Sequence, residues 1–126
     1  MAKKILVIDD EELIIKSLSR LLEKNGYEVF VAKNGQDALV ITEEENFDLI
    51  VADIRMPGIN GVDTVANILQ KKGFKNKPVI FITGYADEEY KRNAQKLKPV
   101  AYIYKPFDIQ ELVGKVRGVL KEKKLP

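Results

Sequence analysis

Four apolar residues, Ile5-Leu6-Val7-Ile8, run directly into the acidic stretch Asp9-Asp10-Glu11 near the start of the chain. Continuous apolar runs of this length are typical of strands that are buried on both faces, as in the middle of a parallel sheet. Further along the chain the same pattern recurs, and the five runs of strand length are residues 5–8, 27–32, 49–52, 79–82 and 101–104.

Helical patterns lie between these runs. Apolar residues recur with helical spacing in residues 14–22, 62–69 and 109–120, and Asp108 is placed to cap the last of these helices. The segment 87–97 has only three apolar positions on one side, so we expect a thinly anchored and mobile helix there. Alternating strands and helices predict one α/β domain over residues 1–126, a doubly wound five-stranded parallel sheet with helices on both faces.

The composition excludes several classes of protein. The chain of 126 residues has no cysteine and no histidine, which excludes disulfides, thiolate metal sites and most hydrolase triads and zinc sites. A net charge of +2 argues against direct nucleic-acid binding. The apolar runs are too short for a membrane span or a signal peptide, so we expect a cytoplasmic protein without a membrane partner.

Polar side chains follow the apolar runs, at the points where the predicted strands end. Asp9 and Asp10 follow the first run, and Asp53 follows the third. Thr83 and Lys105 close the fourth and fifth runs. A single aspartate at such a position is explained as well by a helix cap or a turn. Five such residues at the sheet edge where ligands bind in this class of fold favour a site.

Three carboxylates at one edge need a counter-charge. Two carboxylates about 4 Å apart repel by roughly 4 kcal/mol at an effective dielectric constant of about 20, which is about three pKa units. Lys105 compensates one charge, and the remaining two call for a divalent ion with oxygen ligands, which favours Mg²⁺. No glycine-rich phosphate loop follows the first strand, so a nucleotide site is not predicted. Together the residues predict phosphoryl transfer onto an aspartate.

Four motifs stand in order along the chain: Ile5 to Glu11, Asp53-Ile54-Arg55-Met56-Pro57-Gly58 with Gly61, Ile82-Thr83-Gly84, and Tyr102-Ile103-Tyr104-Lys105-Pro106-Phe107. Together they resemble the motifs of the receiver domain of bacterial two-component response regulators, the CheY-like fold. The resemblance covers essentially the whole chain and implies the strand order 2-1-3-4-5. It implies a phosphorelay signalling domain that is phosphorylated by a sensor histidine kinase or a histidine phosphotransfer domain, rather than a turnover enzyme.

The resemblance assigns roles to the residues at the sheet edge. It makes Asp53 the phospho-acceptor, which undergoes slow autodephosphorylation. It implies that Asp10 and Asp53 bind Mg²⁺ directly, together with the backbone carbonyl of Arg55, and that Asp9 acts largely through water. It places Lys105 against the phosphoryl group and implies a cis peptide bond between Lys105 and Pro106.

The resemblance also implies a switch. Thr83 and Tyr102 form the switch pair, and an output protein or domain binds the face made by the fourth helix, the fifth strand and the fifth helix. A half-buried tyrosine of an edge strand is the simpler interpretation of Tyr102. The side chains of Arg55 and Tyr85 are placed to govern the approach of water, and hence the lifetime of the phosphoryl group. Alternatively, both side chains point to solvent, and Arg55 contributes only its carbonyl.

Besides direct nucleic-acid binding, which the net charge disfavours, two other functions compete with a receiver. A magnesium phosphatase of the haloacid dehalogenase type also uses an aspartate nucleophile at a strand end, but Glu11 stands at the second aspartate of its signature and the chain leaves no room for a cap module. A pseudo-receiver that takes no phosphate is disfavoured by the complete set of site residues. The end at Leu125-Pro126 fits a stand-alone regulator and the excised receiver of a longer protein equally well.

Overall fold

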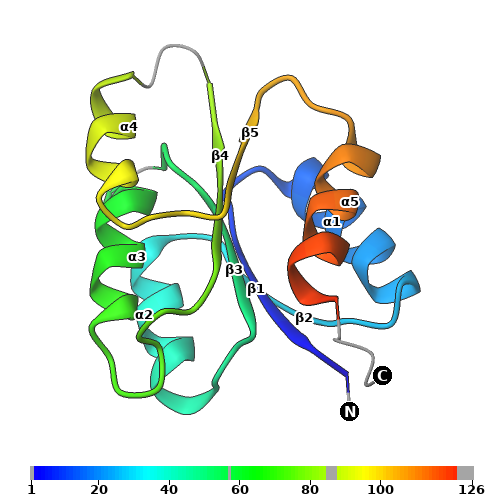
Figure 1. The fold of residues 1–126 in the computed structure, drawn as a ribbon, viewed down its shortest axis with the longest axis horizontal. Helices are drawn as coiled ribbons and strands as arrows, with labels where there is room; N and C mark the ends of the chain where they lie inside the picture. The colour runs from blue at the N-terminus through cyan, green and yellow to red at the C-terminus, as the bar shows by residue number, and fades with distance from the viewer. Residues whose placement is uncertain (1, 57, 85–87, 122–126) are drawn as a thin grey trace, which may run out of the picture.

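The computed structural model describes residues 2–56, 58–84 and 88–121. Its centre is a parallel sheet with the order β2-β1-β3-β4-β5, which confirms the predicted topology (Figure 1). The three central strands are buried almost throughout, as their continuous apolar runs predict. The strands are β1 (Lys4–Ile8), β2 (Glu28–Ala32), β3 (Leu49–Asp53), β4 (Val79–Thr83) and β5 (Ala101–Tyr104).

Helices cover both faces of the sheet. Helices α1 (Glu12–Lys24) and α5 (Ile109–Leu120) lie on one face, and α2 (Gly35–Glu44), α3 (Gly61–Leu69) and α4 (Glu88–Gln95) lie on the other (Figure 1). The predicted doubly wound fold is therefore confirmed. Within the described residues, no helix is long and apolar enough to cross a bilayer.

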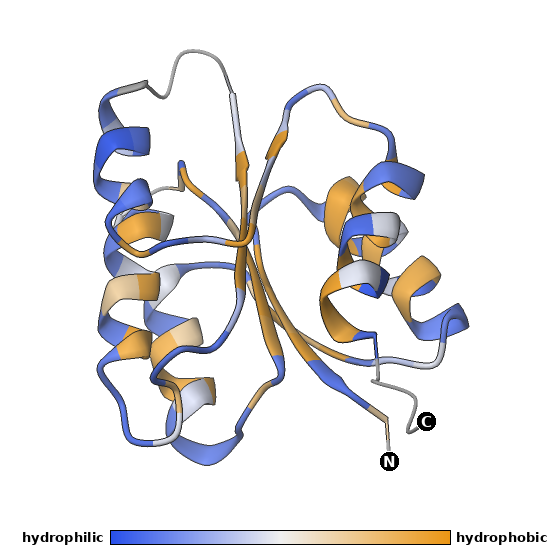
Figure 2. Cartoon of the chain, in the orientation of Figure 1, coloured by the Kyte–Doolittle hydropathy of each residue, from blue (hydrophilic) through white to orange (hydrophobic). Residues whose placement is uncertain are grey.

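Two apolar cores form because successive strand residues point to opposite faces. Ile5 and Val7 of β1 pack in the core beneath α1 and α5, whereas Leu6 and Ile8 pack in the core beneath α2 and α3. Figure 2 shows apolar residues along the strands and a mixture of apolar and polar residues along the helices. Each fully buried side chain of this kind contributes about 1.5–3 kcal/mol. The two cores fix the register of the strands and hence the order of residues at their ends.

The register brings the predicted site residues to one edge. Ile8 is paired with Ala52, so the next residues lie side by side, Asp9 just after β1 and Asp53 as the last residue of β3. The backbone N–H of Lys105 donates to the carbonyl of Thr83 at 2.8 Å, which brings the ends of β4 and β5 together in the same way.

Helix α4 is thinly anchored, as its sequence predicts. Among its described side chains only Ala94 is fully buried, and Tyr90 is partly buried against the core. The predicted mobility of this helix stays a prediction. At α5 the Asp108 carboxylate accepts a hydrogen bond from the N–H of Gln110 at 2.8 Å, which confirms the predicted cap.

Candidate functional site

Three carboxylates meet at the ends of β1 and β3. Asp9, Asp10 and Asp53 each offer one carboxylate oxygen, and these three oxygens lie within 4.8 Å of one another. Asp9 and Asp53 are buried, whereas Asp10 is exposed. The three residues that the sequence predicts as magnesium ligands are therefore brought together, with Asp10 on the side that faces solvent.

Backbone N–H groups orient the two buried carboxylates. The N–H of Glu11 donates to Asp9 Oδ1 at 2.9 Å, and the N–H of Arg55 donates to Asp53 Oδ1 at 3.1 Å. In each case the donor lies two residues after the aspartate, so the turn that leaves the strand holds the carboxylate. The other oxygen of Asp9, Oδ2, is buried and has no hydrogen-bond partner among the described residues. A buried oxygen of this kind is suited to a cation.

Lys105 joins two acidic groups that lie far apart in the sequence. Its Nζ lies 2.7 Å from Asp53 Oδ2 and 2.8 Å from Glu11 Oε1. The peptide bond between Lys105 and Pro106 is cis, as the resemblance to receiver domains implies. The ammonium is thus shared between the predicted phospho-acceptor and a carboxylate at the start of α1.

Burial dominates the titration of the two buried aspartates. Burial raises the pKa of Asp9 to about 6, although the hydrogen bond from the Glu11 N–H opposes the shift. Burial also raises the pKa of Asp53, against the opposing effect of the Lys105 ammonium. For Lys105, burial lowers the pKa, but the hydrogen bonds to Asp53 and Glu11 outweigh it and leave the pKa above its usual range. The site therefore holds excess negative charge that a divalent cation would neutralise.

Gly61 lies so close to the backbone of Asp53 that a side chain at this position would clash with it. A Cβ atom at this position would lie 1.8 Å from the carbonyl oxygen of Asp53. The Gly61 N–H also donates to the carbonyl of Ile54 at 2.8 Å. The loop after β3 therefore returns directly onto the backbone of Asp53, and Gly61 allows that return.

Of the two predicted switch residues, Thr83 is the last residue of β4 and Tyr102 lies on β5. Thr83 is buried, and its hydroxyl donates to the carbonyl of Gly84 at 3.2 Å. The Tyr102 ring is partly buried and stacks on Phe81 with 6.3 Å between ring centroids. The Tyr102 hydroxyl is buried without a hydrogen-bond partner in the part of the chain that the structure describes. Tyr102 therefore has the half-buried position of the simpler interpretation, and its switch role stays a prediction.

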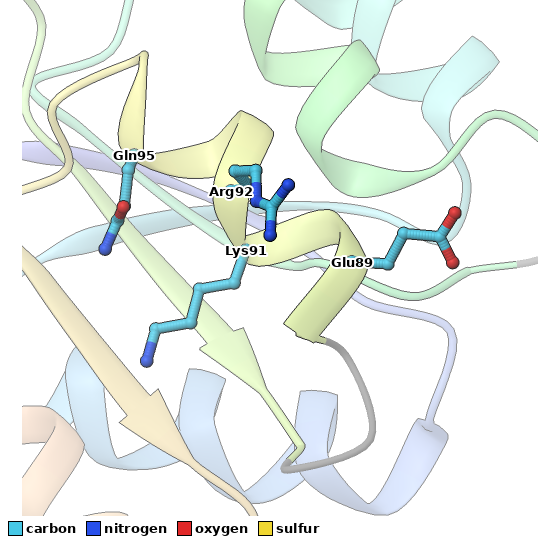
Figure 3. Close-up of a pocket in the computed structure, with 4 residues that line it drawn as sticks. All are labelled: Glu89, Lys91, Arg92 and Gln95. Atoms are coloured by element: carbon cyan, nitrogen blue, oxygen red, sulfur yellow. The ribbon is translucent and has the colours of Figure 1, made fainter.

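Lys91 of α4 covers the tyrosines of β5. Its Nζ lies 5.3 Å from the ring centroid of Tyr102 and 4.6 Å from that of Tyr104, and it donates a hydrogen bond to the Tyr104 hydroxyl. Figure 3 shows the Lys91 side chain extending from α4 toward β5, beside a shallow pocket that Glu89, Arg92 and Gln95 also line. This contact ties the thinly anchored α4 to β5.

The two residues predicted to set the phosphoryl lifetime are only partly described. Arg55 carries an exposed side chain, and its backbone N–H contacts Asp53. Tyr85 lies outside the described residues. Neither the shielding hypothesis nor its solvent-facing alternative is tested by these positions.

The match to known proteins decides the family. The model of the response regulator receiver domain family matches residues 5–117. The chain belongs to this family. This receiver domain is 35% identical to the alkaline phosphatase synthesis transcriptional regulatory protein PhoP of Bacillus subtilis, over 99% of this chain and 51% of that protein. It is 37% identical to the transcriptional regulatory protein CrdR of Helicobacter pylori, over 93% of this chain and 54% of that protein. The chain thus spans about half the length of these curated relatives.

Solved structures agree with this assignment. The receiver domain superposes on the chemotaxis protein CheY4 of Vibrio cholerae with a TM-score of 0.87 at 28% identity, covering 95% of this chain and all of that one. A CheY-like receiver domain protein of Methanospirillum hungatei gives a TM-score of 0.85 at 30% identity, covering 94% of this chain and 93% of that one. The chain is accordingly a signalling domain of two-component systems, and the haloacid dehalogenase alternative is not favoured.

Sequence reasoning missed two contacts of this receiver domain. Glu11 belongs to a matching motif, but no sequence pattern pairs it with Lys105, 94 residues away. Lys91 lies on a predominantly polar helix, where a lysine is ordinarily solvated. The one available signal for Glu11 was its place directly after two aspartates at the sheet edge.

Proposed function

We propose that this receiver domain accepts a phosphoryl group on Asp53 from a histidine of a partner, either a sensor histidine kinase or a histidine phosphotransfer domain. The observation that carries the proposal is the position of Asp53. Its carboxylate is buried at a strand end, is held by the Arg55 N–H, and pairs with Lys105 at 2.7 Å. Because these 126 residues contain no histidine, the phosphohistidine lies outside them.

The reaction balances with this chain's own groups. An oxygen of the Asp53 carboxylate forms a bond to phosphorus while the bond from phosphorus to the partner's imidazole nitrogen breaks, and that nitrogen keeps the electron pair. With acetyl phosphate as donor, the breaking bond joins phosphorus to the bridging oxygen, and acetate leaves. Lys105 transfers its hydrogen bond from Asp53 to a phosphoryl oxygen, and the Thr83 hydroxyl donates to another. The chain positions these groups and is not a turnover enzyme.

The donor set fits Mg²⁺. Three carboxylate oxygens lie within 4.8 Å of one another, and one buried oxygen of Asp9 has no hydrogen-bond partner among the described residues. We assign Asp10, Asp53 and the Arg55 carbonyl as direct ligands, with Asp9 acting largely through water. Bound there, Mg²⁺ would supply positive charge opposite the phosphoryl oxygens.

This chain offers the donor protein a docking surface beside Asp53. A groove of about 520 Å³ borders Lys105, and Leu13 on its rim has 82% of its surface exposed. An imidazole that reaches Asp53 must come from a protein seated near this rim, so we place the histidine-bearing partner in the groove. The residues that line it are Glu11, Leu13, Ile14, Ser17, Lys105, Pro106, Phe107 and Ile109.

The output surface is the face formed by α4, β5 and α5. Phosphorylation would draw Thr83 toward the phosphoryl group and move Tyr102 behind it, which shifts α4 between two positions. The few buried residues of α4 support this assignment, since such a helix is repositioned at low cost. The relatives PhoP and CrdR are transcriptional regulators. An output protein or a further domain is therefore the expected partner of this face, and the cytoplasm is the expected compartment.

Intact mass measurement tests the acceptor. The protein is incubated with acetyl phosphate and Mg²⁺, and we expect a mass increase of one phosphoryl group. Asp53→Asn should abolish it, whereas Asp37→Asn, at an exposed aspartate in the first turn of α2, should leave it unchanged. Full labelling of Asp53→Asn, or no labelling of the wild type by acetyl phosphate or by candidate kinases, would reject the assignment.

Two further measurements test the partners. Leu13→Asp should slow transfer from a phosphorylated histidine partner and leave the reaction with acetyl phosphate unchanged, and Val40→Asp, at another exposed apolar residue, is the control. Equal transfer rates for Leu13→Asp and the wild type would reject the docking surface.

On addition of beryllofluoride and Mg²⁺, amide shifts should spread from Asp53 to Thr83, Tyr102 and Leu97. Shifts confined to the loops around Asp53 would contradict the proposed switch.

A further inference from the structure

We propose that Glu11 is a positioning residue that holds Lys105 away from incoming phosphoryl groups and so restrains phosphorylation by small anionic donors. The inference rests on the proposed function of Asp53 and concerns how the chemistry of that site is regulated. It gives a role to a carboxylate that is neither the acceptor nor one of the assigned magnesium ligands.

The geometry places Glu11 in competition for one ammonium. Lys105 Nζ lies 2.8 Å from Glu11 Oε1 and 2.7 Å from Asp53 Oδ2. An ammonium has three N–H groups, so these two carboxylates occupy two of its three donors. When the Asp53 oxygen attacks phosphorus, the Lys105 ammonium must form a hydrogen bond to a phosphoryl oxygen. The ion pair with Glu11, at the start of α1, opposes this movement of the ammonium.

The backbone of Glu11 makes this hold specific. Its N–H donates to Asp9 Oδ1 at 2.9 Å, and Asp9 is fully buried. The start of α1 is therefore fixed against the acidic cluster, and the Glu11 side chain extends from a fixed point. The ion pair between Glu11 and Lys105 therefore depends on where the Glu11 backbone is held at the sheet edge.

Charge acts in the same direction as geometry. Asp9, Asp10 and Asp53 already outnumber Lys105 as charges at this edge, and Glu11 adds one more negative charge beside the only ammonium in contact with Asp53 among the described residues. An anionic donor such as acetyl phosphate is attracted by the ammonium and repelled by the carboxylate. Removing the Glu11 charge should therefore raise the rate at which acetate is displaced from phosphorus by Asp53.

The test compares three forms of the chain with acetyl phosphate at saturating Mg²⁺. Glu11→Gln should raise the second-order rate constant of Asp53 phosphorylation by roughly two- to five-fold, the range that a partly exposed ion pair supports. Glu12→Gln is the matched control, because Glu12 lies one residue further along and pairs with Lys33 at 2.9 Å, away from Lys105. The control should react at the wild-type rate.

Ionic strength separates positioning from a structural effect. At about 1 M salt the Debye length is about 3 Å, so the exposed pair is screened and the gain of Glu11→Gln should shrink toward unity. A change in folding alone would keep its effect at high salt. Glu11→Asp keeps the charge but shortens the side chain, and it should also react faster than the wild type because it loses the contact with Lys105.

Each outcome decides the inference. An unchanged or slower rate for Glu11→Gln, an equal gain for Glu12→Gln, a gain that persists at high salt, or a wild-type rate for Glu11→Asp would each overturn it. If the wild type is not phosphorylated at all, the proposed function itself fails. If the wild type is phosphorylated and Glu11→Gln matches it, only the role of Glu11 is rejected.

Discussion

Lys105 Nζ lies 2.7 Å from Asp53 Oδ2, although the two residues are 52 positions apart in the sequence. The contact joins the end of β5 to the end of β3 across the intervening strand β4. Asp53 is almost fully buried, whereas the Lys105 side chain keeps 29% of its surface exposed. A buried acceptor is thus joined to a partly exposed cation.

Replacing Lys105 should disable the site without unfolding the domain. Lys105→Met removes the cation that stabilises negative charge on the transferring group, so we expect phosphorylation by acetyl phosphate to slow by about a hundredfold. The pKa of Asp53 should rise further, because Lys105 holds it down against burial. The rate is measured by intact mass and the pKa by carboxyl-carbon NMR. Lys115→Met, at an exposed lysine of α5, should change neither, and a fall in the Asp53 pKa of Lys105→Met would contradict the account.

The metal-free protein should lose stability as the pH rises. Burial raises the pKa of Asp9 in the folded state to about 6, from 3.8 for an aspartate exposed to water. The folded state therefore binds a proton on Asp9 more tightly than the unfolded state does. This protonation stabilises the folded state fully below about pH 4, and the stabilisation is lost as the pH rises through 6. The loss is on the order of 3 kcal/mol.

Urea unfolding in the presence of a chelator measures this effect. The free energy of unfolding of the wild type should fall between pH 4 and pH 7, whereas that of Asp9→Asn should fall much less. Excess Mg²⁺ at pH 7 should restore stability to the wild type by preferential binding to the folded state. A wild-type protein that gains stability over this pH range without metal would refute the assigned pKa shift.

The close approach of Gly61 predicts a large steric effect. Gly61→Ala places a methyl group against the Asp53 carbonyl and should lower the free energy of unfolding by about 1–3 kcal/mol, as overpacking does. Gly114→Ala on α5 is the control, because its Cβ would meet no atom within 4 Å. It should raise the free energy of unfolding by roughly 0.5–1 kcal/mol, as expected for alanine in a helix. Equal effects of the two substitutions in urea unfolding would show that the loop can relax away from Asp53.

The shielding hypothesis predicts a shorter phosphoryl lifetime in a double variant. Arg55→Asn with Tyr85→Glu removes two large side chains and should speed hydrolysis about tenfold, which corresponds to about 1.4 kcal/mol in the barrier. The decay is followed by intact mass after donor removal at saturating Mg²⁺. Unchanged or slower decay would favour the alternative in which both side chains face solvent.

The site residues were predictable where strand ends determine them. Continuous apolar runs mark β1, β3 and β4, and the parallel topology brings the residues that follow, including Asp9 and Asp53, to one edge. Helix α2 was not delimited in the same way, because its continuous apolar run, residues 38–41, lacks the spacing of an amphipathic helix. Its Asn34 cap, which accepts a hydrogen bond from the N–H of Asp37 at 2.8 Å, is the local signal for its start.

Contacts between distant loops were not predictable from the sequence. The pairing of Glu11 with Lys105 depends on the path of the loop after β5, and the approach of Gly61 to Asp53 depends on how the loop after β3 folds back. Local propensity and periodicity carry no information on such distances. Gly61 was expected from the motif, and the structure supplies its physical reason.

Trapping of the acyl phosphate with borohydride tests the central claim most directly. The protein is phosphorylated with acetyl phosphate and Mg²⁺ and then reduced with borohydride, which converts a phosphorylated aspartate into homoserine at the same position. The product is digested and the homoserine is located by mass spectrometry. We expect homoserine at Asp53 alone, and only in samples that received both donor and Mg²⁺. Homoserine at Asp9 or Asp10, or none in the phosphorylated protein, would contradict it.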